Sequence, residues 1–343
     1  MRAHRLFATP LLALFIGVSG STAPAADDLK RNVNGTIWVA NRGADTIRGW
    51  DASTGALVDT IAMRPGSQPG DLVYANHKLY VAEERAAQPA VAIVDLATSN
   101  IKRLFFPPLS RPHHVHASAS GELVAVGLYG TDRVAVIETE NDTVLGEWDS
   151  DPATTTGRVH AGVFSQDGDT LYLLNDATGT LTAMEPRSGL FLWSMPVPGA
   201  HEMVIAHNGK TAFVSRRPLN ALALVDLESH TFRDVLSIGL PDTLRMSANE
   251  KLLTIGVRTP LAQLAVMDTE TSAVTLVNLA PANTGTTTGG HQWTTPNGQY
   301  TFASYEGVSS AGVAVIDHSA GNQVVQWLSY PGAPHGVTHA LPQ

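Results

Sequence analysis

The sequence contains no cysteine. This absence excludes disulfides, zinc sites with cysteine ligands, iron–sulfur clusters, any other thiol-ligated cofactor and thiol nucleophiles. Charge is also scarce, because 15% of the residues are charged and 43% are hydrophobic, a balance typical of a globular chain. The 22 Lys and Arg are outnumbered by 31 Asp and Glu, which gives a formal net charge of −9. This shortage of basic residues argues against nucleic acid or an anionic membrane surface as a partner.

Long hydrophobic runs are missing except at the N-terminus. There, Arg2 and Arg5 precede an apolar stretch from Leu6 to Val18, and Ala23-Pro24-Ala25 follows as a small-residue cleavage signal. This layout is typical of a secretory signal peptide, whereas a membrane anchor would need a longer apolar run. We therefore expect residues 1–26 to be removed, leaving 27–343 as a single periplasmic domain with no membrane span.

The remaining chain is a repeat of roughly 40 residues, the period of a propeller blade with four short strands. Turn signals such as Asp167-Gly168, Asn208-Gly209 and Asn297-Gly298 separate alternating apolar runs. Seven units follow one another, at approximately 36–63, 68–106, 113–149, 158–198, 199–239, 241–280 and 289–332. The pattern predicts an all-β fold, a seven-bladed β-propeller.

The C-terminal segment predicts how this ring closes. The first unit lacks an inner strand, and residues 333–343 form a spare one, in which Pro334 to His339 resembles Pro112 to His116. An open ring would leave an edge strand with unpaired backbone groups. We therefore expect the C-terminal strand to complete the first blade.

Two segments resemble those of YVTN-type seven-bladed β-propellers: Thr170-Leu-Tyr-Leu-Leu-Asn175 and Lys78-Leu-Tyr-Val-Ala82. Each is followed by a strand of the type V-x-V-x-D and a Thr-x-x-Val unit. The resemblance covers nearly the whole mature chain and implies the propeller fold. It says little about activity, because propellers of this kind include lactonases, haem d1 proteins, metal chaperones and binding proteins.

The thirteen histidines carry the functional signal. His113, His160 and His201 each stand eight residues before a turn glycine, at the start of the innermost strand of their blade. His291 lies one residue off this register, and His335 matches through its Pro-His context. The sixth unit has Asp242 at this position and the second has approximately Gln68, so the fold itself does not demand histidine there.

Because innermost strands line the central channel, these side chains predict a histidine-lined mouth that binds zinc or copper. Consecutive blades bring His113, His160 and His201 together with Asp242, while His291 and His335 form a second pair across the ring. Strand alternation places His114 and His116 on one face and His113 on the other. The candidate ligand-binding residues near this mouth are His116, Glu84, Tyr129, Arg216, Arg217, Arg258 and Glu306.

A propeller with such a metal site resembles the periplasmic zinc-chaperone propellers. This resemblance implies a periplasmic metal-transport binding protein as partner. An alternative interpretation is enzymatic. Pro112 to His116 followed by Gly127 to Arg133, and Gly157 to His160 followed by Asn175-Asp176, resemble motifs of the seven-bladed lactonase and muconate-cycloisomerase group. That resemblance implies His160 as the acid–base group and Arg158 or Arg216 as the partner of a substrate carboxylate. The sequence leaves both interpretations open.

Overall fold

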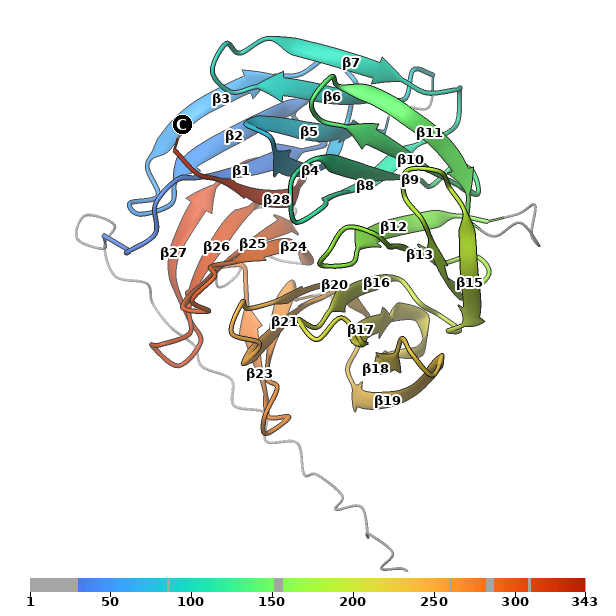
Figure 1. Cartoon of the computed structure of the whole chain (residues 1–343). Helices are drawn as coiled ribbons and strands as arrows, with labels where there is room; N and C mark the ends of the chain where they lie inside the picture. Colours follow the sequence, from blue (N-terminus) through green and yellow to red (C-terminus); the bar gives the residue numbers. More distant parts are fainter. Residues whose placement is uncertain are drawn as a thin grey trace, which may run out of the picture.

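The computed structural model describes residues 30–84, 87–150, 157–258, 261–281, 287–307 and 310–342. The predicted signal peptide, residues 1–26, lies outside the described residues. The described strands form seven antiparallel sheets of four strands each, arranged in a ring (Figure 1). This confirms the predicted all-β, seven-bladed propeller.

In each blade the strands follow one another from the channel outwards. From innermost to outermost, the first four blades are β28 (Pro334–Ala340), β1 (Thr36–Asn41), β2 (Thr46–Asp51), β3 (Leu57–Ala62); β4 (Pro69–Ala75), β5 (Lys78–Glu83), β6 (Ala90–Asp95), β7 (Ile101–Phe105); β8 (Pro112–Ala117), β9 (Leu123–Leu128), β10 (Arg133–Glu138), β11 (Thr143–Asp149); and β12 (Val159–Phe164), β13 (Leu171–Asn175), β14 (Thr180–Met184), β15 (Phe191–Pro196).

The remaining three blades are β16 (Glu202–Ile205), β17 (Thr211–Arg216), β18 (Ala221–Asp226), β19 (Thr231–Ser237); β20 (Pro241–Met246), β21 (Leu252–Val257), β22 (Gln263–Asp268), β23 (Val274–Asn278); and β24 (Thr287–Thr294), β25 (Tyr300–Gly307), β26 (Gly312–Asp317), β27 (Gln323–Ser329). In the part of the chain that the structure describes, one 3-10 turn, η1 (Arg217–Leu219), follows β17. Among the described residues, no helix has the length and apolarity needed to cross a membrane.

The hydrophobic core is divided between the blades. The described residues form seven buried clusters, and each joins the facing sheets of two adjacent blades. Middle strands such as β9 are buried at every position because another blade covers each face, whereas the outermost β3 is largely exposed. A full ring of blade-to-blade contacts therefore holds the fold together, and loss of one large core side chain costs about 2–5 kcal/mol.

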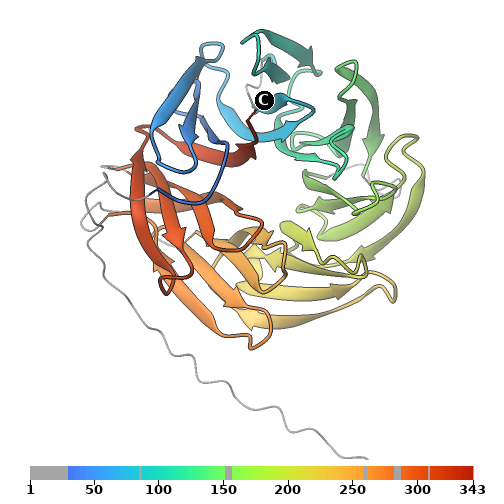
Figure 2. The same ribbon diagram turned by 60° about the vertical axis from the view of Figure 1, so that its left-hand side comes forward.

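The C-terminal strand closes the ring as predicted. β28 pairs antiparallel with β1, with Val337 opposite Val39, and Figure 2 shows this last strand lying inside the first blade. The last blade, which contains β25, is linked directly to this strand, because the Ser304 hydroxyl donates to the His335 carbonyl at 2.6 Å. Each of the seven sheets thus has four strands, and the last strand of the chain completes the first blade.

A β-bulge at the beginning of the innermost strand recurs around the ring. In five blades two consecutive residues fall within the register shift: Gly70 and Asp71, His113 and His114, Asp242 and Thr243, Gly290 and His291, and His335 and Gly336. In β12 the shift contains His160 alone. A bulge interrupts the strict alternation of side chains along a strand. It therefore allows neighbouring residues to reach the same side of the strand.

Candidate functional site

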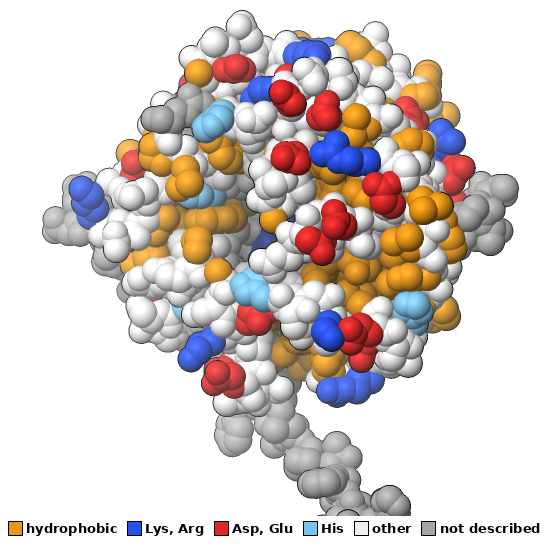
Figure 3. Space-filling model, viewed as in Figure 1, with side chains coloured by type: hydrophobic (Ala, Val, Ile, Leu, Met, Phe, Trp, Pro, Cys, Tyr) orange, Lys and Arg blue, Asp and Glu red, His pale blue; other side chains and the backbone are white. Residues whose placement is uncertain are grey.

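The bulged strand starts meet at one mouth of the central channel. They enclose a pocket of about 180 Å³. Figure 3 shows one face of the ring, on which acidic and basic side chains are interspersed. The pocket is lined by Arg42, His113, His114, Tyr129, His160, His201, Arg217, Asp242, Arg258, His291 and His335. All five histidines that the sequence placed at a strand start therefore line one pocket, together with Asp242.

The imidazole rings form a continuous array across this pocket. Ring centroids are 4.2 Å apart for His335 and His291, and 4.7 Å for His291 and His114, whose planes are nearly parallel. The array continues from His114 to His160 at 4.4 Å and from His160 to His201 at 3.6 Å. His291 and His335 are thus a pair, as expected, but they adjoin the other histidines instead of lying across a wide ring. The mouth is narrower than the sequence suggested.

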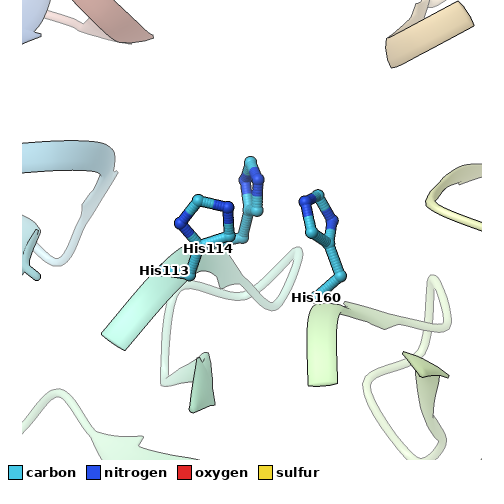
Figure 4. Close-up of side chains that lie close together, drawn as sticks. All are labelled: His113, His114 and His160. Atoms are coloured by element: carbon cyan, nitrogen blue, oxygen red, sulfur yellow. The ribbon is translucent and has the colours of Figure 1, made fainter. Parts of the chain in front are cut away.

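His113 and His114 both face the pocket, which corrects the expectation that they point to opposite faces. Their ring centroids are 4.5 Å apart, and His160 lies 4.9 Å from His113 (Figure 4). The cause is the bulge of β8, which breaks the alternation at these two residues. One ring nitrogen from each of His113, His114 and His160 lies within 4.8 Å of the others, so the three side chains could hold one metal ion.

Two buried carboxylates lie among the rings, and sequence reasoning missed both. Asp71 Oδ2 is 3.1 Å from His114 Nδ1, and its Oδ1 is 3.3 Å from His291 Nδ1. Glu202 Oε1 is 3.3 Å from His160 Nδ1 and 3.5 Å from His114 Nε2. Each carboxylate therefore connects two histidines from different blades.

The sequence signals for these two residues were weak. Asp71, not Gln68, is the second blade's contribution, because Pro69-Gly-Asp-Leu72 matches the bulged Pro112-His-His-Val115 residue for residue. Gln68 precedes β4 and lies outside the pocket lining. Glu202 follows His201 at the start of a strand, where alternation alone would turn it away from its neighbour.

Burial keeps these histidines neutral. It lowers the pKa of His114 to about 4, and it lowers the pKa values of His160 and His335 well below their usual range. A buried charge is costly, so the uncharged imidazole is favoured in all three cases. A neutral imidazole has one free lone pair, and this is the form in which histidine binds metals. Near neutral pH these side chains are ready to act as ligands.

Acidic and basic side chains hold the outer histidines in place. His113 Nδ1 lies 2.7 Å from Glu84 Oε1, and Arg42 donates to the same oxygen at 2.6 Å. Burial opposes the charge on Glu84, but His113 and Arg42 outweigh it and lower its pKa to about 2. On the other side, Glu306 Oε1 lies 3.2 Å from His335 Nδ1, and burial raises the pKa of this carboxyl.

Asp242 organises the opposite wall of the pocket. His201 Nε2 lies 2.7 Å from Asp242 Oδ1, and Arg217 donates to the same oxygen at 2.9 Å. Arg258 Nε approaches Asp242 Oδ2 at 3.6 Å. Burial opposes ionisation, but these three groups hold the pKa of Asp242 well below its usual range. Asp242 is therefore a paired carboxylate that orients His201 and two arginines.

Four predicted residues have contacts other than those expected, although one of them, Tyr129, does line the pocket. Arg216 points away from the pocket, because its guanidinium donates to Asp234 at 2.6 and 2.8 Å and lies over the Phe232 ring. Arg217, not Arg216, reaches the mouth. The positions of the other three are these: Arg158 is half exposed and pairs with Asp176 at 3.1 Å, the Tyr129 hydroxyl donates to Asp176 at 3.0 Å, and His116 lies further along β8, beyond the pocket lining.

No protein-family model and no curated protein matches the sequence. Solved structures do match the fold. A structure described as a 6-phosphogluconolactonase from Bacteroides uniformis has a TM-score of 0.68 at 15% identity, and the match covers 90% of this chain and 100% of that one. The periplasmic gluconolactonase PpgL of Pseudomonas aeruginosa has a TM-score of 0.67 at 16% identity, with the same coverage. The dihydro-heme d1 dehydrogenase NirN has a TM-score of 0.63 at 13% identity over 93% of this chain and 77% of that one.

These likenesses place the chain in a class of proteins, the seven-bladed β-propellers. Within that class, its structural neighbours include the 6-phosphogluconolactonase and gluconolactonase group. At such low identity the shared feature is the fold alone, because unrelated functions use the same architecture. Membership of the YVTN-type family stays a prediction, since it rests on two short sequence segments.

Proposed function

We propose that this protein is an exported β-propeller that binds a transition metal, zinc or copper, at the histidine-lined mouth of its channel. The observation that carries the proposal is the convergence of His113, His114 and His160 from two adjacent blades. Imidazole ligands without thiolate suit zinc and copper better than calcium or magnesium, which prefer oxygen. The chemistry of the donor set therefore selects the class of ion.

The surroundings of the three histidines support a bound ion. Both His114 and His160 are buried and favour the neutral form that a metal requires. Carboxylates contact the ring nitrogens of all three: Glu84 at His113, Asp71 and Glu202 at His114, and Glu202 at His160. Carboxylates next to histidine ligands orient the rings and make them more basic. Three protein nitrogens would leave a further position open towards the pocket.

Metal titration of the purified protein tests this proposal. We expect one tightly bound zinc or copper ion at the mouth near neutral pH, measured by isothermal titration and by metal analysis after dialysis. The triple variant His113→Ala, His114→Ala, His160→Ala should lose that ion. His207→Ala is the matched control, because His207 lies outside the pocket. A wild-type protein that binds zinc and copper no better than the triple variant would refute the proposal.

The biological role that fits such a site is metal carriage. An exported protein with an ion held at an open mouth could pass it to a periplasmic metal-transport binding protein, the partner we propose. The pocket supports this role because one side of the ion remains accessible to an incoming ligand. Transfer of zinc from the loaded propeller to an apo-binding protein, followed by competition with a chromogenic chelator, would test it directly.

A second candidate function is lactone hydrolysis or cycloisomerisation of a carboxylated substrate. The observation that favours it is the presence of Arg42, Arg217 and Arg258 in the same pocket as His160, because guanidinium groups bind carboxylates bidentately. The lactonase-like neighbours also favour it. In this function His160 would move the proton and the arginines would hold the carboxylate.

The two candidates differ in their response to a chelator. Metal-independent turnover of a carboxylated lactone, retained in EDTA and lost in His160→Ala, would favour the enzyme. Arg216→Ala is the matched control for the arginines, since Arg216 is bound to Asp234 outside the pocket. Absence of turnover across a panel of γ- and δ-lactones would exclude the enzymatic role for those substrates.

A further inference from the structure

Beneath the mouth, two buried carboxylates lack a basic partner. Asp71 and Glu202 are almost completely buried, and within the described residues neither forms an ion pair with a lysine or arginine. Their neighbours are histidines, which burial keeps neutral in the case of His114. Arg245 acts on Glu202 only through its field, because its guanidinium donates to the Leu244 carbonyl. Neither carboxylate is therefore neutralised by direct contact with a lysine or arginine of the described residues.

Glu202 is the more exceptional of the two. Both of its carboxylate oxygens are buried, and neither accepts a hydrogen bond from any described residue. By contrast, Asp71 Oδ2 accepts a hydrogen bond from the Val115 amide at 3.2 Å. A buried polar group that is left unpaired costs about 1–3 kcal/mol, and more if it is charged. An unpaired buried carboxylate of this kind indicates a ligand-binding role.

The third member of this group is His116. Its Nε2 atom is buried and also has no hydrogen-bond partner among the described residues. Ligand atoms of His114, His116 and Glu202 lie within 4.8 Å of one another. His116 and His114 are two residues apart on β8, so both extend to the channel side of the strand, one below the other.

We propose that the channel interior holds a second divalent transition-metal ion, bound by His116, Glu202 and His114, below the ion at the mouth. This inference rests on the proposed metal-binding function and extends it to two ions per chain. Two nitrogens and one carboxylate oxygen form a mixed donor set of the kind that binds zinc. A divalent ion here also brings positive charge into direct contact with Glu202.

His114 belongs to both ligand groups, and this determines what happens to its ring proton when both ions bind. One imidazole has two ring nitrogens, and Nε2 is the one that faces Glu202. When both ions are bound, His114 contributes one nitrogen to each, and its ring proton passes to solvent. The two ions each lose water ligands as the protein ligands bind. Full loading therefore releases one proton from His114.

The test is a cobalt(II) and zinc titration of the full-length protein. Metal analysis after dialysis should give two ions per chain for the wild-type protein. Anomalous scattering from crystals of the loaded protein should place one ion at His113 and His160 and the other at His116 and Glu202. His116→Ala should lose only the second ion, because His116 is absent from the mouth group. His113→Ala should lose only the first.

Glu202→Gln provides a second variant that keeps the shape of the side chain. It should remove the inner ion and weaken the outer one about tenfold or more, because Glu202 also contacts His160. If His116→Ala fails to fold by circular dichroism, Glu202→Gln and the anomalous map still decide. His207→Ala should bind both ions.

The outcomes separate the two proposals. One ion per chain, retained in His116→Ala and lost in His113→Ala, would overturn the inner site and keep the mouth site. One ion lost in His116→Ala and retained in His113→Ala would support the inner site and overturn the mouth site. Absence of stoichiometric binding would overturn both, and the anomalous map would then show no ion at either position.

Discussion

The two ends of the innermost strands carry two very different pockets. The histidine pocket at the strand starts has a volume of about 180 Å³, whereas a pocket of about 700 Å³ lies at the opposite ends of strands such as β4, β8 and β28. Glu122, Glu138, Glu140 and Arg187 line the larger pocket, and Arg187 pairs with Glu122 and Glu138 at 3.4 and 3.5 Å. Its charges are compensated by one another and by solvent.

This difference shows that volume alone does not identify the end of the ring that carries the candidate site. The smaller pocket contains buried histidines in mutual contact, and Asp71 and Glu202 contact these histidines without forming an ion pair with a described lysine or arginine. Such an arrangement is costly unless a ligand uses it. The larger pocket contains side chains in their ordinary surface state, since Glu122 is 69% exposed. The following predictions test whether substitutions at the two ends differ in their effects on metal affinity and on the free energy of unfolding.

The largest expected effect separates the two ends by metal affinity. Replacing His113, His114 and His160 with alanine should weaken zinc binding at the mouth by about 1,000-fold or more, which corresponds to about 4 kcal/mol. Replacing Glu122, Glu138 and Glu140 with glutamine should leave it unchanged. Isothermal titration of both triple variants measures this. Equal losses in the two variants would mean that the ion binds elsewhere.

Acid should weaken the metal-free protein through the buried histidines. The pKa of His114 is about 4 in the folded protein against 6.5 in the unfolded chain, so the unfolded chain binds more protons between these values. Stability is thus fully present above pH 6.5 and falls as the pH drops towards 4, by about 3 kcal/mol from this group alone. Urea unfolding in EDTA at several pH values measures the slope.

A substitution at the same position provides the control for that slope. His114→Gln removes the titrating group, so its unfolding free energy should depend less on pH between 6.5 and 4 than that of the wild-type protein. The variant His207→Ala, outside the pocket, should keep the wild-type slope. A slope unaffected by His114→Gln would show that other groups cause the acid sensitivity.

A smaller effect is expected at the edge of the mouth. Glu84→Gln removes the carboxylate that contacts His113 at 2.7 Å and leaves Arg42 without its charged partner. Loss of such an outer partner weakens metal binding about 10- to 100-fold. A zinc competition assay measures the change. Glu83→Gln is unsuitable as a control because Glu83 is bound by two arginines, so Glu138→Gln serves instead.

The smallest effect is expected for a single change at the large pocket. Glu140→Gln alters an exposed side chain, so the free energy of unfolding should change by less than about 0.5 kcal/mol. Thermal unfolding with and without zinc measures it. A larger change in the free energy of unfolding, or a change in the stabilisation by zinc, would contradict the proposed difference between the two ends.

The fold could be predicted because it depends on repeated local signals. Turn dipeptides such as Asn208-Gly209 mark hairpins, and short continuous apolar runs mark strands that are covered on both faces. The Pro-His context of His335 also revealed the closing strand, because the same bulged start occurs at Pro112. Repetition allowed one blade to explain another.

The site could be predicted only in part, because local irregularity places its residues. The shared position of His113, His160 and His201 identified the mouth, whereas the bulge that turns His114 to the same side has no reliable signal in a single sequence. Glu202 was missed for a similar reason. Arg216 and Arg217 are adjacent in sequence, and only the turn at η1 separates the one that meets Asp234 from the one that meets Asp242.

The closing strand also orders events in folding. His113, His114 and His160 come from consecutive blades and can meet through contacts between neighbouring parts of the chain. His335 joins them only when β28 pairs with β1, a contact between residues about 300 positions apart. Contacts so distant in sequence form slowly. The three-histidine group can therefore assemble before the ring closes, while the complete pocket exists only in chains that have finished folding.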